Sequence, residues 1–177
     1  MNTHLLEIYS RIEERYSEPV PIGGRCESFV YYRVEDLTEE DLLSSAEYVA
    51  SRVKNVLAPS KLDVIMKLPG GYTFFAERLS AVYSEMYCKG AEIPVEQYGE
   101  ARISNGLGEK YRGKNAILVT DVITTARSSI EAHTKATLRG VKIMAWATLI
   151  DRTFGPGPVS VVSAYTGEPV RLKTNVG

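Results

Sequence analysis

Hydrophobic residues recur along this chain with two different periods. Near the N-terminus, Leu5, Ile8 and Ile12 follow helical spacing, which predicts a first helix over residues 3–16. A stretch rich in proline and glycine at residues 19–24 then breaks the chain. Beyond it, short apolar runs predict strands and longer amphipathic segments predict helices. We predict strands at residues 28–34, 63–66, 92–98, 116–119, 141–150 and 159–164, and helices at residues 38–56, at residues 74–89 and between the turn at 124–129 and Gly140.

The order of these elements defines the expected fold class. Strands that alternate with helices favour an α/β fold, with a central parallel sheet and helices on both of its faces. Neither an internal repeat nor a linker divides the 177 residues, so we expect one domain over residues 1–177. Thr38 with Asp41 three residues later is a capping-box-like start for the helix at 38–56.

Composition narrows the classes of function. With 44% hydrophobic and 24% charged residues the chain is typical of a globular protein, and its net charge of −1 gives no electrostatic support for binding nucleic acid. No apolar run approaches the roughly 18–20 residues that a membrane span needs, and the N-terminal segment lacks the apolar core of a signal peptide. The two cysteines have no metal-ligand spacing. We therefore expect a cytoplasmic protein without a membrane partner.

The segment from Ala116 to Ala136 carries the candidate chemistry. Its apolar run is followed by a single carboxylate, Asp121, and by a turn rich in hydroxyl groups before a helix. Parallel sheets bind ligands at the carboxyl ends of their strands, and a helix N-terminus favours a phosphate. The carboxylate can accept hydrogen bonds from ribose hydroxyls or hold a metal-bound water. The segment therefore suits a sugar phosphate, although an ordinary strand-turn-helix with capping threonines has the same outline.

The same segment resembles the phosphoribosyl-diphosphate (PRPP) signature of type I phosphoribosyltransferases. That signature is an apolar run, two acidic residues, two loose positions, two Thr or Ser, Gly, one loose position and Thr or Ser. Here it reads ILV-T-D-VI-TT-A-R-S, with Thr120 at the first acidic position and Ala126 at the glycine position. The alanine is compatible with a phosphate cradle if its φ stays negative. The resemblance implies that PRPP binds at Asp121, Thr124, Thr125, Ala126, Arg127 and Ser128.

Within that family, the chain resembles orotate phosphoribosyltransferase over most of its length. Residues 24–32 are similar to an SGR-x-S-x-Y-Y segment, and residues 151–152 to an Asp-Arg pair after the last core strand. Residues 67–71, KLPGG, are similar to a Pro-x-x-Gly-Gly phosphate loop but are shorter. The resemblance implies that Pro69, Gly70 and Gly71 bring backbone amides to the pyrophosphate of PRPP. It also implies a base site at Arg25, Phe29 and Arg152, where a ring stacks on the pyrimidine and an arginine binds its carboxylate.

The family's mobile catalytic loop carries several basic residues and a histidine. Here Glu100-Ala101-Arg102 matches a Glu-Ala-Lys core of that loop, which implies a catalytic role for Arg102 beside the departing pyrophosphate. Tyr98 and Gly99 stand where basic residues are expected, and the stretch has no histidine. Because preorganised cations matter most where charge develops, we expect a slow chemical step.

The resemblance implies a type I phosphoribosyltransferase fold, in which helices flank a central parallel sheet and the N- and C-terminal segments form a small hood. The implied reaction belongs to pyrimidine biosynthesis: a nitrogen of orotate attacks C1 of PRPP, pyrophosphate leaves and orotidine 5-monophosphate forms. Mg²⁺ would bridge pyrophosphate and ribose oxygens without direct protein ligands. Asp121 and Arg102 would stabilise charge, and the protein would be a homodimer.

Other functions stay open at this point. Thr120, Ala126 and the loop with few cations are compatible with a sensor that binds PRPP or a nucleotide without turnover. A phosphoribosyltransferase for another base is equally compatible. A receiver-like signalling domain with Asp121 as phosphoacceptor fits less well, because the N-terminal region lacks the acidic pair that would hold Mg²⁺.

Overall fold

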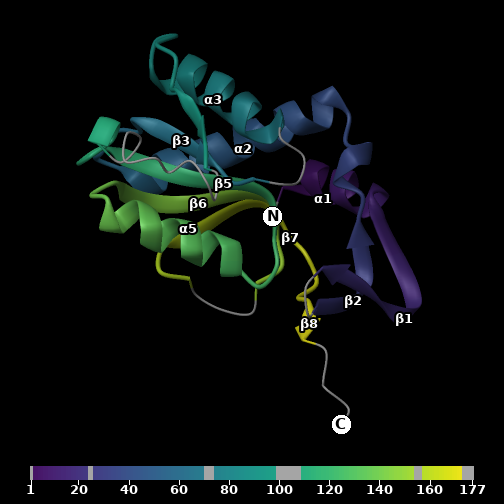
Figure 1. Cartoon of the computed structure of the whole chain (residues 1–177). Coiled ribbons are helices and arrows are strands. Elements are labelled where there is room, and N and C mark those ends of the chain that lie inside the picture. Colours follow the sequence, from purple (N-terminus) through teal and green to yellow (C-terminus); the bar gives the residue numbers. More distant parts are fainter. Residues whose placement is uncertain (1, 24–25, 70–73, 99–108, 154–156, 173–177) are drawn as a thin grey trace.

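A five-stranded parallel sheet forms the centre of the molecule (Figure 1). The computed structural model describes residues 2–23, 26–69, 74–98, 109–153 and 157–172. The strands of this sheet are β3 (Val64–Lys67), β4 (Val95–Gln97), β5 (Asn115–Ile123), β6 (Lys142–Asp151) and β7 (Ser160–Thr166). Their order is β4-β3-β5-β6-β7, and every neighbouring pair is parallel. The predicted parallel sheet is therefore confirmed.

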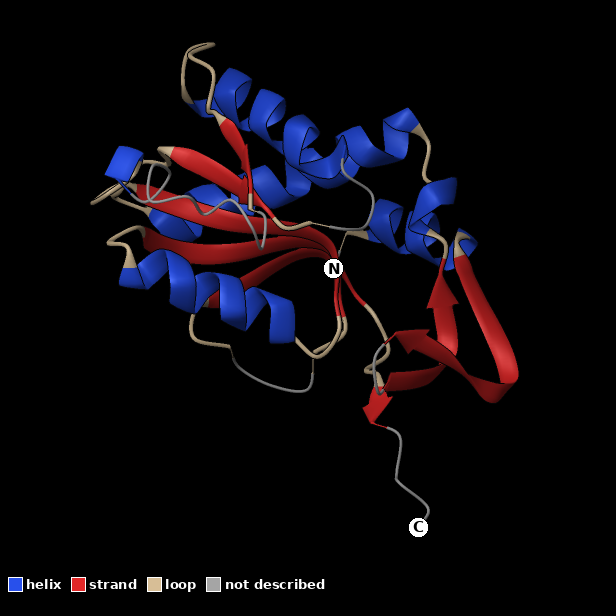
Figure 2. Cartoon of the chain, in the orientation of Figure 1, coloured by secondary structure: helices blue, strands red, loops and turns tan. Residues whose placement is uncertain are grey.

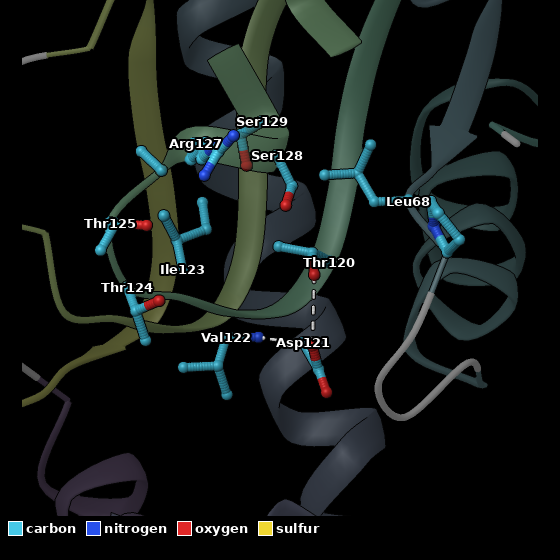
Figure 3. A pocket seen from close by; sticks show the side chains of 12 residues that line it. Leu68, Thr120, Asp121, Val122, Ile123, Thr124, Thr125, Arg127, Ser128 and Ser129 are labelled. Carbon is cyan, nitrogen blue, oxygen red and sulfur yellow. Dashed lines mark hydrogen bonds between the residues drawn. The ribbon is translucent and has the colours of Figure 1, made fainter. Parts of the chain in front are cut away.

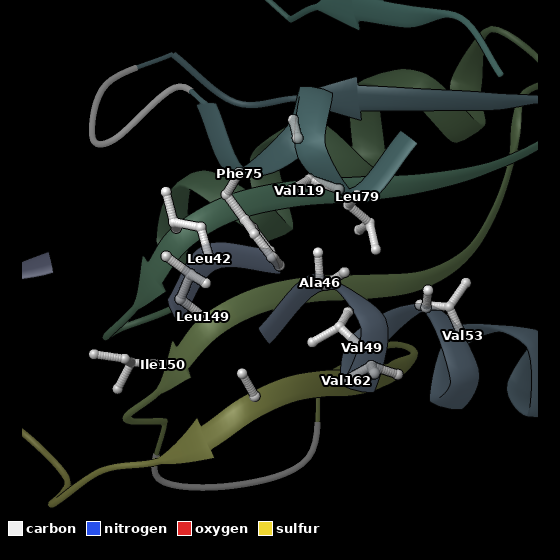
Figure 4. Close-up of a cluster of buried hydrophobic side chains, with 14 of the residues drawn as sticks. Leu42, Ala46, Val49, Val53, Phe75, Leu79, Val119, Leu149, Ile150 and Val162 are labelled. Atoms are coloured by element: carbon white, nitrogen blue, oxygen red, sulfur yellow. The ribbon is translucent and has the colours of Figure 1, made fainter. Parts of the chain in front are cut away.

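Helices cover both faces of this sheet, as the alternating pattern predicts (Figure 2). The helices are α1 (Thr3–Arg11), α2 (Glu39–Leu57), α3 (Phe74–Tyr87) and α5 (Arg127–Leu138). On one face Ile117 and Val119 of β5 share a core with α1, α2 and α3, and Figure 4 shows Val119 in this layer. On the other face Leu118 and Trp146 share a smaller core with α5. Because side chains alternate along a strand, one apolar run serves both layers.

The hood is a small antiparallel sheet beside the main one (Figure 1). It contains β1 (Glu13–Gly23), β2 (Cys26–Tyr32) and β8 (Arg171–Leu172). Their order is β1-β2-β8, so N- and C-terminal segments build it together, as predicted. A short 3-10 helix, η1 (Val34–Asp36), leads from the hood to α2.

One predicted helix is too long. The first helix ends at Arg11 rather than at residue 16, because Glu13 and Glu14 already pair with Tyr32 and Tyr31 of β2. Residues 19–23 of the stretch predicted as a break instead belong to β1. Proline is tolerated there because β1 is an edge strand, and its pairing with β2 is irregular between Arg15 and Val20.

The strand predicted at 116–119 is longer than its apolar run. β5 continues to Ile123 because β6 runs beside it as far, pairing Thr120 with Thr148 and Val122 with Ile150. Asp121 therefore lies within the strand rather than just beyond its end. The other predicted strands and helices are confirmed with shifts of a few residues at their ends. Among the described residues, no helix is both long and apolar enough to cross a membrane.

The predicted capping box forms at the start of α2. The Thr38 hydroxyl accepts from the Asp41 N–H at 3.2 Å, and the Asp41 carboxylate accepts from the Thr38 N–H at 2.8 Å. Arg11 of α1 forms an ion pair with the same carboxylate. Burial would by itself raise the pKa of Asp41, but the hydrogen bonds from Thr38 and the charge of Arg11 outweigh it, so this pKa lies below its ordinary value.

We predict that Asp41→Asn lowers the free energy of unfolding by about 2 kcal/mol at pH 7, because hydrogen bonds to an ionised group are lost. A lowered pKa stabilises the fold above the unfolded-state pKa of Asp, and this contribution disappears as pH falls through the folded-state pKa. The difference between variant and wild type should therefore shrink below about pH 4. Urea unfolding at several pH values measures it. Glu40→Gln, an exposed change in the same helical turn, should cost only about 0.5 kcal/mol. A pH-independent difference for Asp41→Asn would contradict the prediction.

Candidate functional site

The predicted PRPP segment lies at the carboxyl edge of the central sheet. The end of β5, the turn after it and the first turn of α5 surround a hollow of about 180 Å³. Leu68 and Pro69, which follow β3, complete its wall. Figure 3 shows that the side chains of residues 120–129 curve around this hollow. Parallel α/β sheets bind ligands at this edge.

Asp121 is held by its own neighbours. Its Oδ1 accepts from the Val122 N–H at 2.8 Å and from the Thr120 hydroxyl at 3.2 Å. The second carboxylate oxygen points away from these two donors (Figure 3). Thr120, which replaces the first acidic residue of the signature, therefore contributes a hydrogen-bond donor instead of a second negative charge.

Sequence reasoning missed Thr148, which supports Asp121 from the next strand. Its side chain is fully buried, and its hydroxyl donates to the Asp121 carbonyl at 2.8 Å and to the Ile150 carbonyl at 3.2 Å. The available signal was a single hydroxyl in an otherwise apolar strand, since a buried polar group needs a partner.

The turn after β5 offers hydroxyl and amide donors together. The hydroxyls of Thr124, Thr125 and Ser128 line the inside of this turn (Figure 3). Helix α5 begins at Arg127 without a side-chain cap hydrogen bond among the described residues. Its first intrahelical bond runs from the Ile130 N–H to the Ala126 carbonyl at 2.8 Å. The preceding N–H groups are therefore left for a ligand, and the helix dipole favours an anion there.

The backbone of Ala126 does not meet the condition under which the sequence makes alanine compatible with the cradle. Its φ is +57° and its ψ is 5°, so it adopts the left-handed conformation and not a negative φ. The turn must reverse direction between β5 and α5, and glycine, which stands here in the family signature, adopts this conformation without a Cβ clash. The alanine keeps the shape of the turn at an energetic cost of about 1–2 kcal/mol.

The structure leaves several predicted site residues untested. Arg25, Gly70, Gly71 and Arg102 lie outside the described residues. Tyr98 is described, and it is not a substitute for a basic loop residue. Its side chain is buried in the core beneath α5, and its N–H donates to the Lys67 carbonyl at 2.8 Å.

Arg152 and Phe29 were predicted to share a base site, but the structure does not bring them together. The buried Arg152 Nε donates to the Glu168 carbonyl at 2.7 Å, and its Nη2 donates to the Ser28 hydroxyl. Phe29 follows Ser28 in β2, so its ring points to the opposite face, where Arg171 lies 4.9 Å from the ring centre. The two residues thus lie on different sides of one hood strand.

Arg152 connects the hood to the central sheet. Its N–H donates to the Ile123 carbonyl at 2.8 Å, and its guanidinium lies 5.2 Å from the centre of the Tyr32 ring. Burial lowers the pKa of Arg152, although arginine stays charged in proteins. Among the described residues, no group of three or more His, Cys, Asp or Glu side chains is placed to hold a metal ion.

No protein-family model and no curated protein sequence matches the chain. Solved structures do match it. The orotate phosphoribosyltransferase of Francisella tularensis superposes with a TM-score of 0.64 at 15% identity, over 92% of this chain and 85% of that one. That of Aeropyrum pernix gives 0.62 at 16% identity, over 94% and 93%. The HGPRT-ase of Leishmania tarentolae in complex with GMP gives 0.59 at 13% identity, over 75% and 80%.

These similarities define the fold. The chain has the type I phosphoribosyltransferase fold, a central parallel sheet flanked by helices with a hood at one side. The alignments with the two orotate phosphoribosyltransferases cover 92% and 94% of this chain. The expectation of such a fold from the PRPP signature is confirmed.

We predict that Ala126→Gly raises the free energy of unfolding by about 0.5–1 kcal/mol, because glycine tolerates the positive φ. Urea denaturation measures the change. Ala132→Gly, the same substitution inside α5, should instead lower stability by about 1 kcal/mol or more. A loss of stability in Ala126→Gly would mean that this turn is not left-handed in solution.

We also predict that Arg152→Met loosens the hood without unfolding the central sheet, because the guanidinium contacts with Ser28, Glu168 and Tyr32 are lost. Amide hydrogen exchange should accelerate about tenfold or more in β2 and stay unchanged within β5. Arg171→Met, which removes an exposed cation from the outer face of the hood, should change exchange in β2 by less than about twofold. Unchanged protection of β2 in Arg152→Met would refute this role.

Proposed function

We propose that this protein binds PRPP and transfers its ribose 5-phosphate to a nitrogenous base, with release of pyrophosphate. One observation carries the proposal. A carboxylate fixed by neighbouring donors, Asp121, directly precedes a turn of hydroxyls and uncapped helix amides at the carboxyl edge of a parallel sheet. A phosphate and a ribose need these two kinds of group side by side.

The 5-phosphate would lie on the turn between β5 and α5. Amides of the first turn of α5 and the hydroxyls of Thr124, Thr125 and Ser128 would donate to its oxygens, and Arg127 would add a positive charge. Because the helix holds its amides in place, little reorganisation is needed when the anion binds.

Asp121 would act on the ribose. Its carboxylate would accept hydrogen bonds from ribose hydroxyls and stabilise the positive charge that develops at C1 as pyrophosphate leaves. The pyrophosphate would lie toward Pro69 and the proposed amide donors Gly70 and Gly71, with Arg102 as a catalytic cation. The residues would therefore accelerate the reaction mainly by positioning and charge stabilisation.

Mg²⁺ fits the oxygen-rich side chains of this hollow. The ion usually keeps several waters when it binds substrate phosphates, and the Asp121 carboxylate can accept hydrogen bonds from such metal-bound waters. When bound with PRPP, Mg²⁺ would neutralise charge on the pyrophosphate. Asp121 would contact the Mg²⁺ ion through water, because the family resemblance implies no direct protein ligand.

Orotate is the proposed base. The alignments with the two orotate phosphoribosyltransferases cover 92% and 94% of this chain, whereas the alignment with the HGPRT-ase covers 75%, and this wider coverage supports orotate as the base. The base would lie between hood and sheet edge, with Arg25 and Arg152 as candidates for its carboxylate. In this arrangement of β2, Phe29 lies on the outer face and does not line that space.

Two further features belong to the proposal. The protein would act as a homodimer, because in the family that it resembles the catalytic loop reaches the partner's site, and sedimentation at micromolar concentration tests this.

A sensor that binds PRPP without turnover is the second candidate function. Thr120 favours it, because a hydroxyl replaces one negative charge that would stabilise a positive transition state.

Calorimetry and a pyrophosphate-release assay test the proposed function together. PRPP with Mg²⁺ should bind, and pyrophosphate should form with orotate but not with uracil or hypoxanthine. Binding without release for any base would favour the sensor. A protein that does not bind PRPP would refute both functions.

We predict that Asp121→Asn weakens PRPP binding or turnover at least about tenfold, because a charged acceptor for the ribose is lost. Asp63→Asn is the matched control. Asp63 accepts from the Asn115 N–H at 2.9 Å at the opposite end of β5, so its loss should leave PRPP affinity within about twofold. Equal effects of the two variants would contradict the assignment of Asp121.

A further inference from the structure

We propose that Thr148 is a positioning residue for the ribose-binding carboxylate, and this inference rests on the proposed function of Asp121. Thr148 does not line the hollow, and it belongs to none of the predicted motifs. Its hydroxyl nevertheless reaches across from β6 to the Asp121 carbonyl at 2.8 Å.

One peptide group links Thr148 to the Asp121 carboxylate. The Asp121 carbonyl and the Val122 N–H belong to the same planar unit and point in opposite directions. The carbonyl accepts from Thr148 at 2.8 Å, while the N–H donates to the Asp121 carboxylate, also at 2.8 Å. This peptide is therefore held at one end by Thr148, and its other end holds the carboxylate. Rotation of the peptide plane would move the donor that orients Oδ1.

A hydroxyl as deeply buried as that of Thr148 needs an acceptor, and the Asp121 carbonyl at 2.8 Å is nearer than the Ile150 carbonyl at 3.2 Å. Thr148 is fully buried, and its neighbours Ala147 and Leu149 lie in the core beneath α2. Alternation along β6 places Thr148 on the same face as Trp146, which α5 covers. Valine has nearly the same shape and a higher affinity for an apolar core, so packing alone does not account for a threonine here.

The consequence is a division of roles between two strands. Asp121 of β5 would contact the ribose, while Thr148 of β6 would set the angle at which the carboxylate is presented. A carboxylate that rotates freely pays an entropic cost when PRPP binds, and a peptide held at both ends removes part of that cost.

The test compares Thr148→Val with Thr148→Ser. Valine keeps the volume and removes both hydrogen bonds, whereas serine keeps the hydroxyl and leaves a small cavity. We expect Thr148→Val to weaken PRPP binding about tenfold in calorimetry with Mg²⁺, and to speed amide exchange at Val122. We expect Thr148→Ser to bind PRPP within about twofold of wild type, although it unfolds at lower urea concentration. Ser45→Ala, which removes a buried hydroxyl bonded to Tyr9 between α2 and α1 on the other face of the sheet, should lose stability and keep PRPP affinity.

Several results would overturn the inference. In Thr148→Val these are wild-type exchange at Val122, or faster exchange with unchanged PRPP affinity. Equal loss of affinity in the valine and serine variants would show a purely structural role. If wild type itself fails to bind PRPP, the proposed function falls, and the Val122 exchange rates still decide whether Thr148 holds the peptide.

Discussion

The pairing of β5 with β6 beyond the apolar run is the constraint on which the candidate site depends. The continuous apolar run of β5 ends at Val119, yet the two strands stay paired to Ile123 and Asp151 across the polar residues Thr120 and Asp121. This extension puts Asp121 on a rigid element rather than in a loop. It also brings the buried Thr148 hydroxyl to the Asp121 carbonyl. The sheet therefore holds the carboxylate in a better defined position than a loop would.

A strained turn and a helix start without a side-chain cap follow directly after β5 in the described structure. The chain turns into α5 through Ala126 in the left-handed conformation, and the helix starts without a side-chain cap among the described residues. Both features reduce stability on their own. Residues held in costly backbone conformations concentrate at functional sites, and this turn fits that pattern. The proposed phosphate would supply the partner that the helix start lacks.

The hood is tied to the same edge by one buried cation. Arg152 follows the last residue of β6, bonds through its N–H to Ile123 and reaches Ser28 and Glu168 with its side chain. Ile123 lines the hollow, so the hood and the proposed phosphate turn share a backbone connection. The position of the hood is therefore coupled to the edge at which a base would meet the ribose.

Local patterns in the sequence determined the parallel sheet, most element positions, the capping box of α2 and the segment around Asp121, because period, capping and motif spacing are properties of neighbouring residues. Tertiary structure decided the rest. Residues 13–16 follow a helical pattern but form a strand, because β2 offers them hydrogen-bond partners. Ala126 has a positive φ because the turn joins two packed elements. Phe29 and Arg152 lie on different sides of β2, because Ser28 faces Arg152 and Phe29 is the next residue along the strand. Thr148 contacts Asp121 only because β6 lies beside β5. Contacts between segments distant in sequence are set by packing, and no local pattern encodes them.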